Sequence, residues 1–313
     1  MTLQAPYFPI DQPVMPEGRQ IGRGVCIEHL ENRLATPAHQ WLIGQRRIGK
    51  TSVAKAVLAR LQKQGHVTLD LDLSKLQLSD SQALAGEIAR QGRAAGAGNS
   101  GEAQRLFGIV RKHKKNAKAL GNLLKELGFE EEGQALAAVS AILAEGDGGA
   151  PGLDRVLGAL ALHAAATGQR VHLLFDEIHL LANLDGAPEQ IAKWCREENS
   201  PLVFIFAGSE ESAAQALREP GQPLAAIGEE FKLTEIAAED WIPGLKDRFG
   251  EAGVKIERRE LKSILSASEC HPRRTMLVSS RVSASARAAP EAIATPTMVE
   301  LAIKDAEEDR SWR

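Results

Sequence analysis

The chain carries the stretch QWLIGQRRIGKTS at residues 40–52. Its opening residues favour a buried strand, and the residues from Lys50 to about Lys63 favour a helix. The glycine-rich turn between them fits the pattern G-x-x-x-x-G-K-[ST] at every fixed position. The positions expected to line a phosphate site are Gly44, Gln45, Arg46, Arg47, Ile48, Gly49, Lys50, Thr51 and Ser52.

The spacing of this loop has a chemical reason. Glycines allow backbone N–H groups to curl around phosphates at the positive end of the following helix. We expect Lys50 to reach the β- and γ-phosphates and the hydroxyl of Thr51 to hold Mg²⁺. A chance glycine-rich turn is the alternative, but it would not explain the strand before the loop and the helix after it. The stretch therefore predicts a nucleoside triphosphate site, with ATP and Mg²⁺ as the expected ligands.

A second chemical element reads VHLLFDE at residues 171–177. This apolar strand ends in two adjacent carboxylates, at the end where open α/β sheets bind ligands. We expect Asp176 to complete the Mg²⁺ shell and Glu177 to polarise the attacking water as a general base. Two solvated acids closing a strand would be the alternative. A P-loop kinase for small molecules needs no water-activating glutamate, so the pair favours hydrolysis.

The wider pattern predicts an α/β core followed by helices. Further strands are expected near residues 66–73, 202–207 and 230–233, with a helical insert at about 76–168. After Thr234, helices are expected near 239–249, 258–267, 272–286 and 297–308. The predicted organisation is an extended N-terminal arm (1–18), a nucleotide-binding parallel-sheet core (19–235) and a small all-helical lid (236–313).

Composition limits the function classes. The 313 residues carry a net charge of -3, so a role with nucleic acid or membrane would need a local patch. No run approaches the roughly 18 apolar residues of a membrane span, and the first residues do not read as a signal peptide. Cys26, Cys195 and Cys270 are widely spaced and read as reduced thiols. A soluble cytoplasmic protein is expected.

Five stretches together resemble one family. They are IGRG at 21–24, GQRRIGKTS at 44–52, LLFDEIHLL at 173–181, FIFAGSEES at 204–212 and CHPRRTM at 270–276. In this order they are similar to AAA+ ATPases of the ASCE class of P-loop NTPases. Within that group the chain looks most like the archaeal-type ATPases allied to the STAND proteins. The resemblance spans about residues 20–285.

The resemblance implies further site residues. Ile21 to Gly24, with Gly22 and Arg23 among them, would lie against the adenine, and Ser209 would be a first sensor that contacts the γ-phosphate or the attacking water. Arg273 or Arg274, at the start of the third lid helix, would be a second sensor that moves the lid. A turn residue is the alternative for Ser209, and a solvated helix start is the alternative for the two arginines.

One departure from the family concerns the arginine finger. AAA+ rings usually supply it from near the fifth strand, but residues 226–230 here read AIGEE. Arg218 is the nearest candidate, and a surface role fits it equally well. The departure implies slow or partner-stimulated turnover, while the resemblance still implies an ATP-dependent homo-oligomer.

The helical insert carries a basic stretch. Its cations are Arg111, Lys112, Lys114, Lys115 and Lys118. They would suit contacts with the phosphates of DNA or RNA, while a solvated helix face and a docking surface for a protein are the alternatives. The family-level expectation is an ATPase that remodels or recruits a protein or DNA partner, in a DNA transaction, transposition regulation or defence. The competing expectation is a non-hydrolysing ATP-dependent switch that gates an effector.

Overall fold

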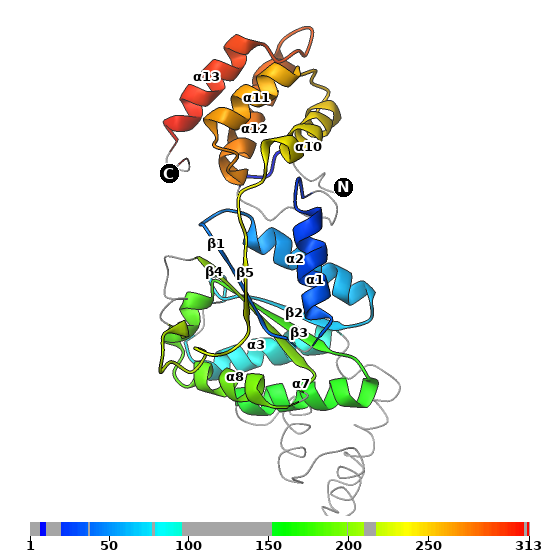
Figure 1. Cartoon of the computed structure of the whole chain (residues 1–313), viewed down its shortest axis with the longest axis vertical. Coiled ribbons are helices and arrows are strands. Elements are labelled where there is room, and N and C mark those ends of the chain that lie inside the picture. The colour runs from blue at the N-terminus through cyan, green and yellow to red at the C-terminus, as the bar shows by residue number, and fades with distance from the viewer. Residues whose placement is uncertain are drawn as a thin grey trace, which may run out of the picture. The chain divides into compact units, whose positions relative to one another are not determined.

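The computed structural model describes residues 7–10, 20–36, 38–76, 79–95, 152–198, 200–209, 217–309 and 312. Its centre is a parallel five-stranded sheet (Figure 1). The strands are β1 (Gln40–Gly44), β2 (Val67–Asp72), β3 (Val171–Asp176), β4 (Leu202–Ser209) and β5 (Glu229–Lys232). Their order across the sheet is β2-β3-β4-β1-β5, so β4 separates the strand of the glycine-rich loop from the strand that ends in Asp176.

The core strands are buried because helices cover them. β3 is buried at all six positions, as expected for an unbroken apolar run in a parallel sheet covered on both faces. Its residues pair in parallel with β2 on one side and β4 on the other, and this register sets Asp72 opposite Asp176. Where β4 adjoins β1, the N–H of Phe204 in β4 donates a hydrogen bond to Nδ1 of His39, the residue before β1 (3.1 Å).

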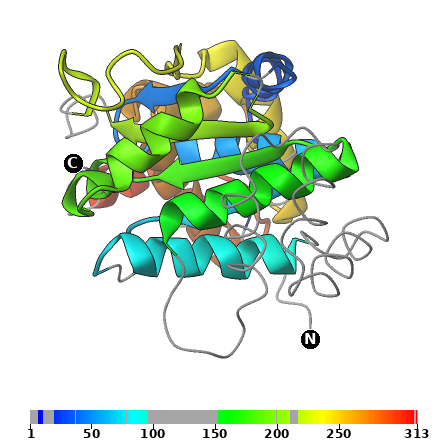
Figure 2. The same cartoon turned by 90° about the horizontal axis from the view of Figure 1, so that it is seen from below.

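Among the core helices, Lys50–Lys63 and the two ends of the helical insert were predicted. The core helices are α1 (Gly24–Leu34), α2 (Lys50–Lys63), α3 (Ser81–Ala94), α7 (Leu153–Thr167), the short 3₁₀ helix η1 (Ile178–Asn183) and α8 (Ala187–Arg196). α3, α7 and α8 pack on one face of the sheet in a single apolar core (Figure 2). α3 and α7 are the described ends of the predicted helical insert, and its basic stretch (111–118) lies outside the described residues.

The C-terminal region is helical, as predicted. It contains α10 (Ala238–Glu251), α11 (Arg258–Ala267), α12 (Pro272–Ala288) and α13 (Pro296–Glu307). These helices enclose a second apolar core around Trp241 and Phe249, and the ring of Phe8 in the N-terminal arm packs at a tilt against that of Phe249, with centroids 4.8 Å apart. None of the helices in the described parts of the chain is long and apolar enough to cross a bilayer.

The chain divides into two compact units. One unit combines Met1–His29, Gly44–Ala56 and Leu233–Arg313, and the other combines Leu30–Ile43 and Val57–Lys232. The glycine-rich loop therefore groups with the lid helices, whereas most of the sheet forms the other unit. The parallel α/β class and the helical C-terminal region expected from the sequence are confirmed.

Candidate functional site

The glycine-rich loop leaves the sheet at the end of β1 and enters α2 at Lys50. A Cβ on Gly44 would lie 2.6 Å from the backbone oxygen of Leu233, so only glycine fits there. Gly49 has a φ of +102°, a region that L side chains rarely adopt. Arg47 also has a positive φ, of 63°. The loop therefore has the tight, partly left-handed backbone that aims successive N–H groups at an anion.

The side chain of Lys50 turns back over this loop. Its Nζ donates hydrogen bonds to the carbonyl oxygens of Gly44 (3.0 Å) and Gln45 (2.8 Å). The ammonium group thus sits beside the backbone that would cradle phosphates. A phosphate oxygen would offer it a charged acceptor in place of two neutral carbonyls, and hydrogen bonds between charged partners are the stronger ones.

The carboxylate pair closes β3. Asp176 is only 4% exposed, and its Oδ1 accepts the N–H of Glu177 (3.0 Å). Glu177 has a φ of 54°, which is uncommon outside glycine and often marks functional sites. Its side chain is half exposed, with Oε2 3.4 Å from Nδ1 of His179. One carboxylate is therefore buried in the sheet edge, while its neighbour turns outward where a water molecule can reach it.

Sheet topology brings the predicted groups to one edge. Ser209 is the last residue of β4, and β4 lies between β1 and β3. Since parallel strands end at the same edge, Ser209 stands between the strand that leads into Gly44 and the strand that ends in Asp176. The first-sensor role of Ser209 stays a prediction, and its place in the sheet agrees with it.

A further acid–base pair at this edge was missed. Asp72 ends β2 opposite Asp176, and its Oδ2 lies 2.6 Å from Nζ of Lys75. Burial works to raise the pKa of Asp72, but hydrogen bonds from Lys75 and Ser74 lower it overall. The hydrogen bond to Asp72 also raises the pKa of Lys75. Lys75 thus keeps a positive charge beside two carboxylates. The signal in the sequence was an acid at the end of the strand before VHLLFDE.

Arg23 has contacts that the sequence did not reveal. Its side chain is buried, with Nη2 donating to the carbonyl of Ile48 (2.9 Å) and Nη1 to the carbonyl of Thr234 (2.7 Å). Desolvation lowers the pKa of this guanidinium. Neighbouring Gly22 has a φ of +65°, and a Cβ there would collide with Ile236. The adenine contact expected of Gly22 and Arg23 stays a prediction, while the observed contacts tie the loop to the start of the lid.

A second lid contact reaches the loop through His271. This residue precedes α12, and its Nε2 lies 3.2 Å from the carbonyl oxygen of Arg46. Burial lowers the pKa of His271, so the ring is neutral near pH 7 and bonds through an Nε2–H tautomer. The stretch CHPRRTM had suggested only its two arginines, although the adjacent histidine makes the loop contact.

The predicted arginines differ in their surroundings. Arg274 donates to the carboxylate of Glu269 and to the carbonyl of Trp312, and its guanidinium lies over the Trp312 ring at 5.4 Å. These contacts give Arg274 a structural role in the lid, and Arg273 also has an interaction within the described residues, so the contacts do not choose between the two. Both sensor assignments stay predictions.

Arg218 is also engaged within its own chain. Its Nη1 lies 3.1 Å from Oε2 of Glu230 in β5, and its guanidinium lies over the ring of Trp41 at 5.2 Å. A finger supplied to a neighbouring subunit would have to leave both contacts. The arginine-finger role stays a prediction, and these contacts favour the alternative that Arg218 stabilises the edge of the sheet.

Thr51 and Asp176 are the residues predicted to hold Mg²⁺, and this role stays a prediction. In the described residues, no three His, Cys, Asp or Glu side chains gather into a metal site made of protein alone. Mg²⁺ commonly binds through one or two protein oxygens and completes its shell with phosphates and water. The Thr51 hydroxyl and the buried Asp176 carboxylate are oxygen donors of this kind.

No protein-family model and no curated protein sequence matches the chain. Solved structures do match its fold. The Walker-type ATPase PABY2304 of Pyrococcus abyssi superposes with a TM-score of 0.64 at 16% identity, over 96% of this chain and 75% of that chain. The Aeropyrum pernix ORC2 protein, in its ADPNP–ADP complexes, gives 0.61 at 17% identity, over 96% and 71%.

A third neighbour is the Aeropyrum pernix ORC1 protein in complex with DNA. It gives a TM-score of 0.54 at 16% identity, over 96% of this chain and 68% of that chain. These neighbours are AAA+ proteins, so the chain has the AAA+ P-loop ATPase fold that its motifs resemble. At such identities the likeness concerns the fold, and activity has to be argued from the site.

Proposed function

We propose that the chain binds ATP in the loop Gly44–Thr51 and hydrolyses it in the presence of Mg²⁺. Lys50 contacts the β- and γ-phosphates, and Thr51 and Asp176 provide protein oxygens for the metal. Bound Mg²⁺ supplies charge neutralisation for the phosphates. Glu177 accepts a proton from the attacking water, for which its outward-facing carboxylate is suited.

One observation supports this proposal above the others. A complete phosphate-binding loop follows β1 and an Asp–Glu pair ends β3, in a single parallel sheet with Ser209 on the strand between them. A binding-only protein would need the loop but would have no use for a water-activating carboxylate next to the buried Asp176. The AAA+ fold of the structural neighbours agrees with this chemistry.

We further propose that the nucleotide state of the loop is passed to the lid. The carbonyls of Ile48 and Arg46 are contacted by Arg23 and His271, which belong to the same compact unit as the lid helices. A phosphate that reshapes the loop would strain these bonds and move the lid, with Arg273 or Arg274 as the reporting side chain. That movement would remodel or recruit a partner in an ATP-dependent homo-oligomer in the cytoplasm.

The partner is proposed to be a protein or DNA. The DNA-bound state of the Aeropyrum pernix ORC1 protein supports the second choice, as does the basic stretch of the insert, Arg111 to Lys118. DNA transactions, transposition regulation and defence are the settings in which such an ATPase would act.

Phosphate release from ATP tests the reaction directly. Glu177→Gln should keep nucleotide binding and lose at least about 100-fold of the turnover, the size typical of a lost general base. Glu198→Gln is the matched control, because Glu198 is an exposed glutamate after α8. If the wild-type chain binds ATP but shows no turnover with or without DNA, the non-hydrolysing switch replaces the ATPase as the proposed function.

A further inference from the structure

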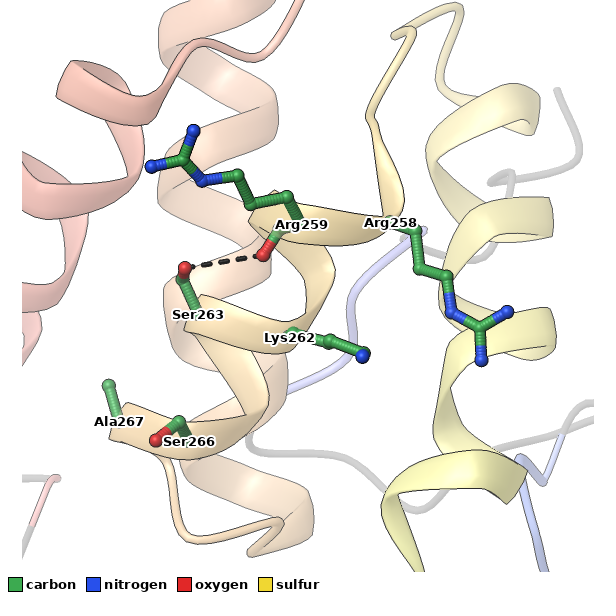
Figure 3. A pocket seen from close by; sticks show the side chains of 6 residues that line it. All are labelled: Arg258, Arg259, Lys262, Ser263, Ser266 and Ala267. Carbon is green, nitrogen blue, oxygen red and sulfur yellow. Dashed lines mark hydrogen bonds between the residues drawn. The ribbon is translucent and has the colours of Figure 1, made fainter.

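Helix α11 has two unlike faces. Leu261, Ile264 and Leu265 are buried in the core of the lid. The opposite face lines a hollow of ≈ 730 Å³, shown in Figure 3. The residues that line it are Arg258, Arg259, Lys262, Ser263, Ser266 and Ala267. We call this hollow the α11 groove, and it contains every cation of the helix.

The cations of the α11 groove flank a track of short side chains. Arg258 and Lys262 are one helical turn apart and extend on the same side of α11 in Figure 3. Arg259 extends on the other side, and Ser263 and Ser266 follow along its stripe. An extended ligand on this face of the helix can therefore meet positive charges on both sides of α11 and hydroxyl groups on the side of Arg259.

These cations have no anionic partner within the part of the chain that the structure describes. No carboxylate lies within ion-pair distance of Arg258, Arg259 or Lys262 there. Elsewhere in the lid the pattern is different, since Arg281 on α12 lies 3.0 Å from a carboxylate oxygen of Asp305. In a chain with a net charge of -3, three exposed and unpaired cations on one helix make a local positive patch that would attract an external anion.

We propose that the α11 groove binds the phosphodiester backbone of a nucleic acid. Arginine, lysine and serine are the side chains that most often contact phosphates. A docking site for an acidic protein would be expected to include a large apolar or aromatic anchor, and the lining has none. Phosphates offer these cations the same contacts whatever the bases, so binding through the phosphodiester backbone is expected to be independent of sequence.

The charges set the expected salt dependence. Each phosphate neutralised by a cation contributes about -0.9 to the slope of log affinity against log salt concentration. Three contacts contribute roughly -2.7, which weakens binding about 40-fold when salt rises from about 50 to about 200 mM. The groove uses no residue of the nucleotide site, so a titration without nucleotide tests it separately, and a failed ATPase proposal would not remove it.

The experiment measures the anisotropy of a labelled random-sequence DNA duplex, titrated with the full chain over this salt range. The variant is Arg258→Glu/Arg259→Glu/Lys262→Glu. Acidic residues in the first turn suit the positive end of a helix, so α11 is expected to keep its fold. The control, Arg155→Glu/Arg287→Glu/Lys304→Glu, makes the same change in net charge at exposed positions on α7, α12 and α13.

The groove variant should lose at least about 10-fold in affinity at low salt and reduce the salt slope by 2 to 3, while the control changes neither by much. Equal losses of affinity in the groove variant and the control would overturn the proposal, because the duplex would then respond to the net charge of the chain and not to the groove. Binding of poly-glutamate in preference to the duplex would overturn it in favour of an acidic protein. A loss confined to Lys112→Glu/Lys114→Glu/Lys115→Glu would overturn it in favour of the insert.

Discussion

Arg23 gives the sharpest test of how the nucleotide loop is held. Its guanidinium is buried and donates to the carbonyls of Ile48 and Thr234, so replacement by methionine leaves two carbonyls without their donors. Hydrogen bonds from a charged group contribute about 1.5–3 kcal/mol each, and the desolvation of the guanidinium offsets part of that sum. We expect Arg23→Met to lower the free energy of unfolding by about 2–4 kcal/mol.

Thermal unfolding measures this loss. For a chain of this size, 1 kcal/mol shifts Tm by about 2–4 °C, so Arg23→Met should melt roughly 4–16 °C below wild type. Because Ile48 belongs to the loop, the affinity for a fluorescent ATP analogue should also fall, by about tenfold or more for each 1.4 kcal/mol that the loop loses. The Tm and the ATP affinity of Arg23→Lys should lie between those of wild type and Arg23→Met, since one ammonium cannot match the planar guanidinium that reaches both carbonyls.

Arg155→Met is the matched control. Arg155 is exposed on α7, and its side chain has no partner within the described residues. The Tm of Arg155→Met should stay within about 1 °C of the wild-type Tm, as for most surface substitutions. A Tm for Arg23→Met within the same range, with unchanged ATP affinity, would refute the reasoning, because water would then be satisfying both carbonyls.

Two further predictions concern the loop glycine and a buried histidine. Gly44→Ala should destabilise the fold by about 1–3 kcal/mol and weaken ATP binding, because its Cβ would meet the Leu233 carbonyl at 2.6 Å. The control Gly250→Ala, on α10 with open space around its Cβ, should not weaken ATP binding or lower the melting temperature in the same assays. Burial lowers the pKa of His172 to about 3, with His66 adding to the effect, so the fold accepts only the neutral ring. The unfolded chain takes up a proton below about pH 6.5, so stability falls as pH drops from there towards 3, by about 2 kcal/mol at pH 5. His172→Phe should remove this loss in urea titrations at pH 5 and pH 7, and an unchanged pH dependence would assign it to other groups.

Local signals explain why much of the fold was predictable. The helices Lys50–Lys63 and Arg258–Ala267 have the predicted bounds. Both are rich in strong helix formers; the first begins where the loop motif ends, and the second carries an apolar stripe that faces the core. The strand over 171–175 was expected from its apolar run and extends by one residue to Asp176. The 3₁₀ helix Ile178–Asn183 was missed, since it depends on the left-handed backbone of Glu177, which the residue type does not reveal.

Long-range contacts explain what could not be predicted. Arg23 and Thr234 are 211 positions apart, and no local pattern indicates that a guanidinium just before the first helix binds a carbonyl after the last strand. The contact between His271 and Arg46, 225 positions apart, is of the same kind. By contrast, the loop and carboxylate motifs were visible because their chemistry lies in consecutive residues. Their roles with ATP and Mg²⁺ stay predictions until turnover is measured.

The position of Thr234 has a consequence for synthesis on the ribosome. The loop Gly44–Thr51 emerges early, but its backbone is completed by the carbonyl of Leu233 beside Gly44 and by the bond from Arg23 to Thr234. The apolar core of the sheet uses residues up to Ile227, so it can condense before the loop has its last partners. A nascent chain halted before residue 233 would carry the whole phosphate-binding motif without a finished site. If the chain binds ATP as proposed, nucleotide capture would therefore wait until the residues at the start of the lid have been made.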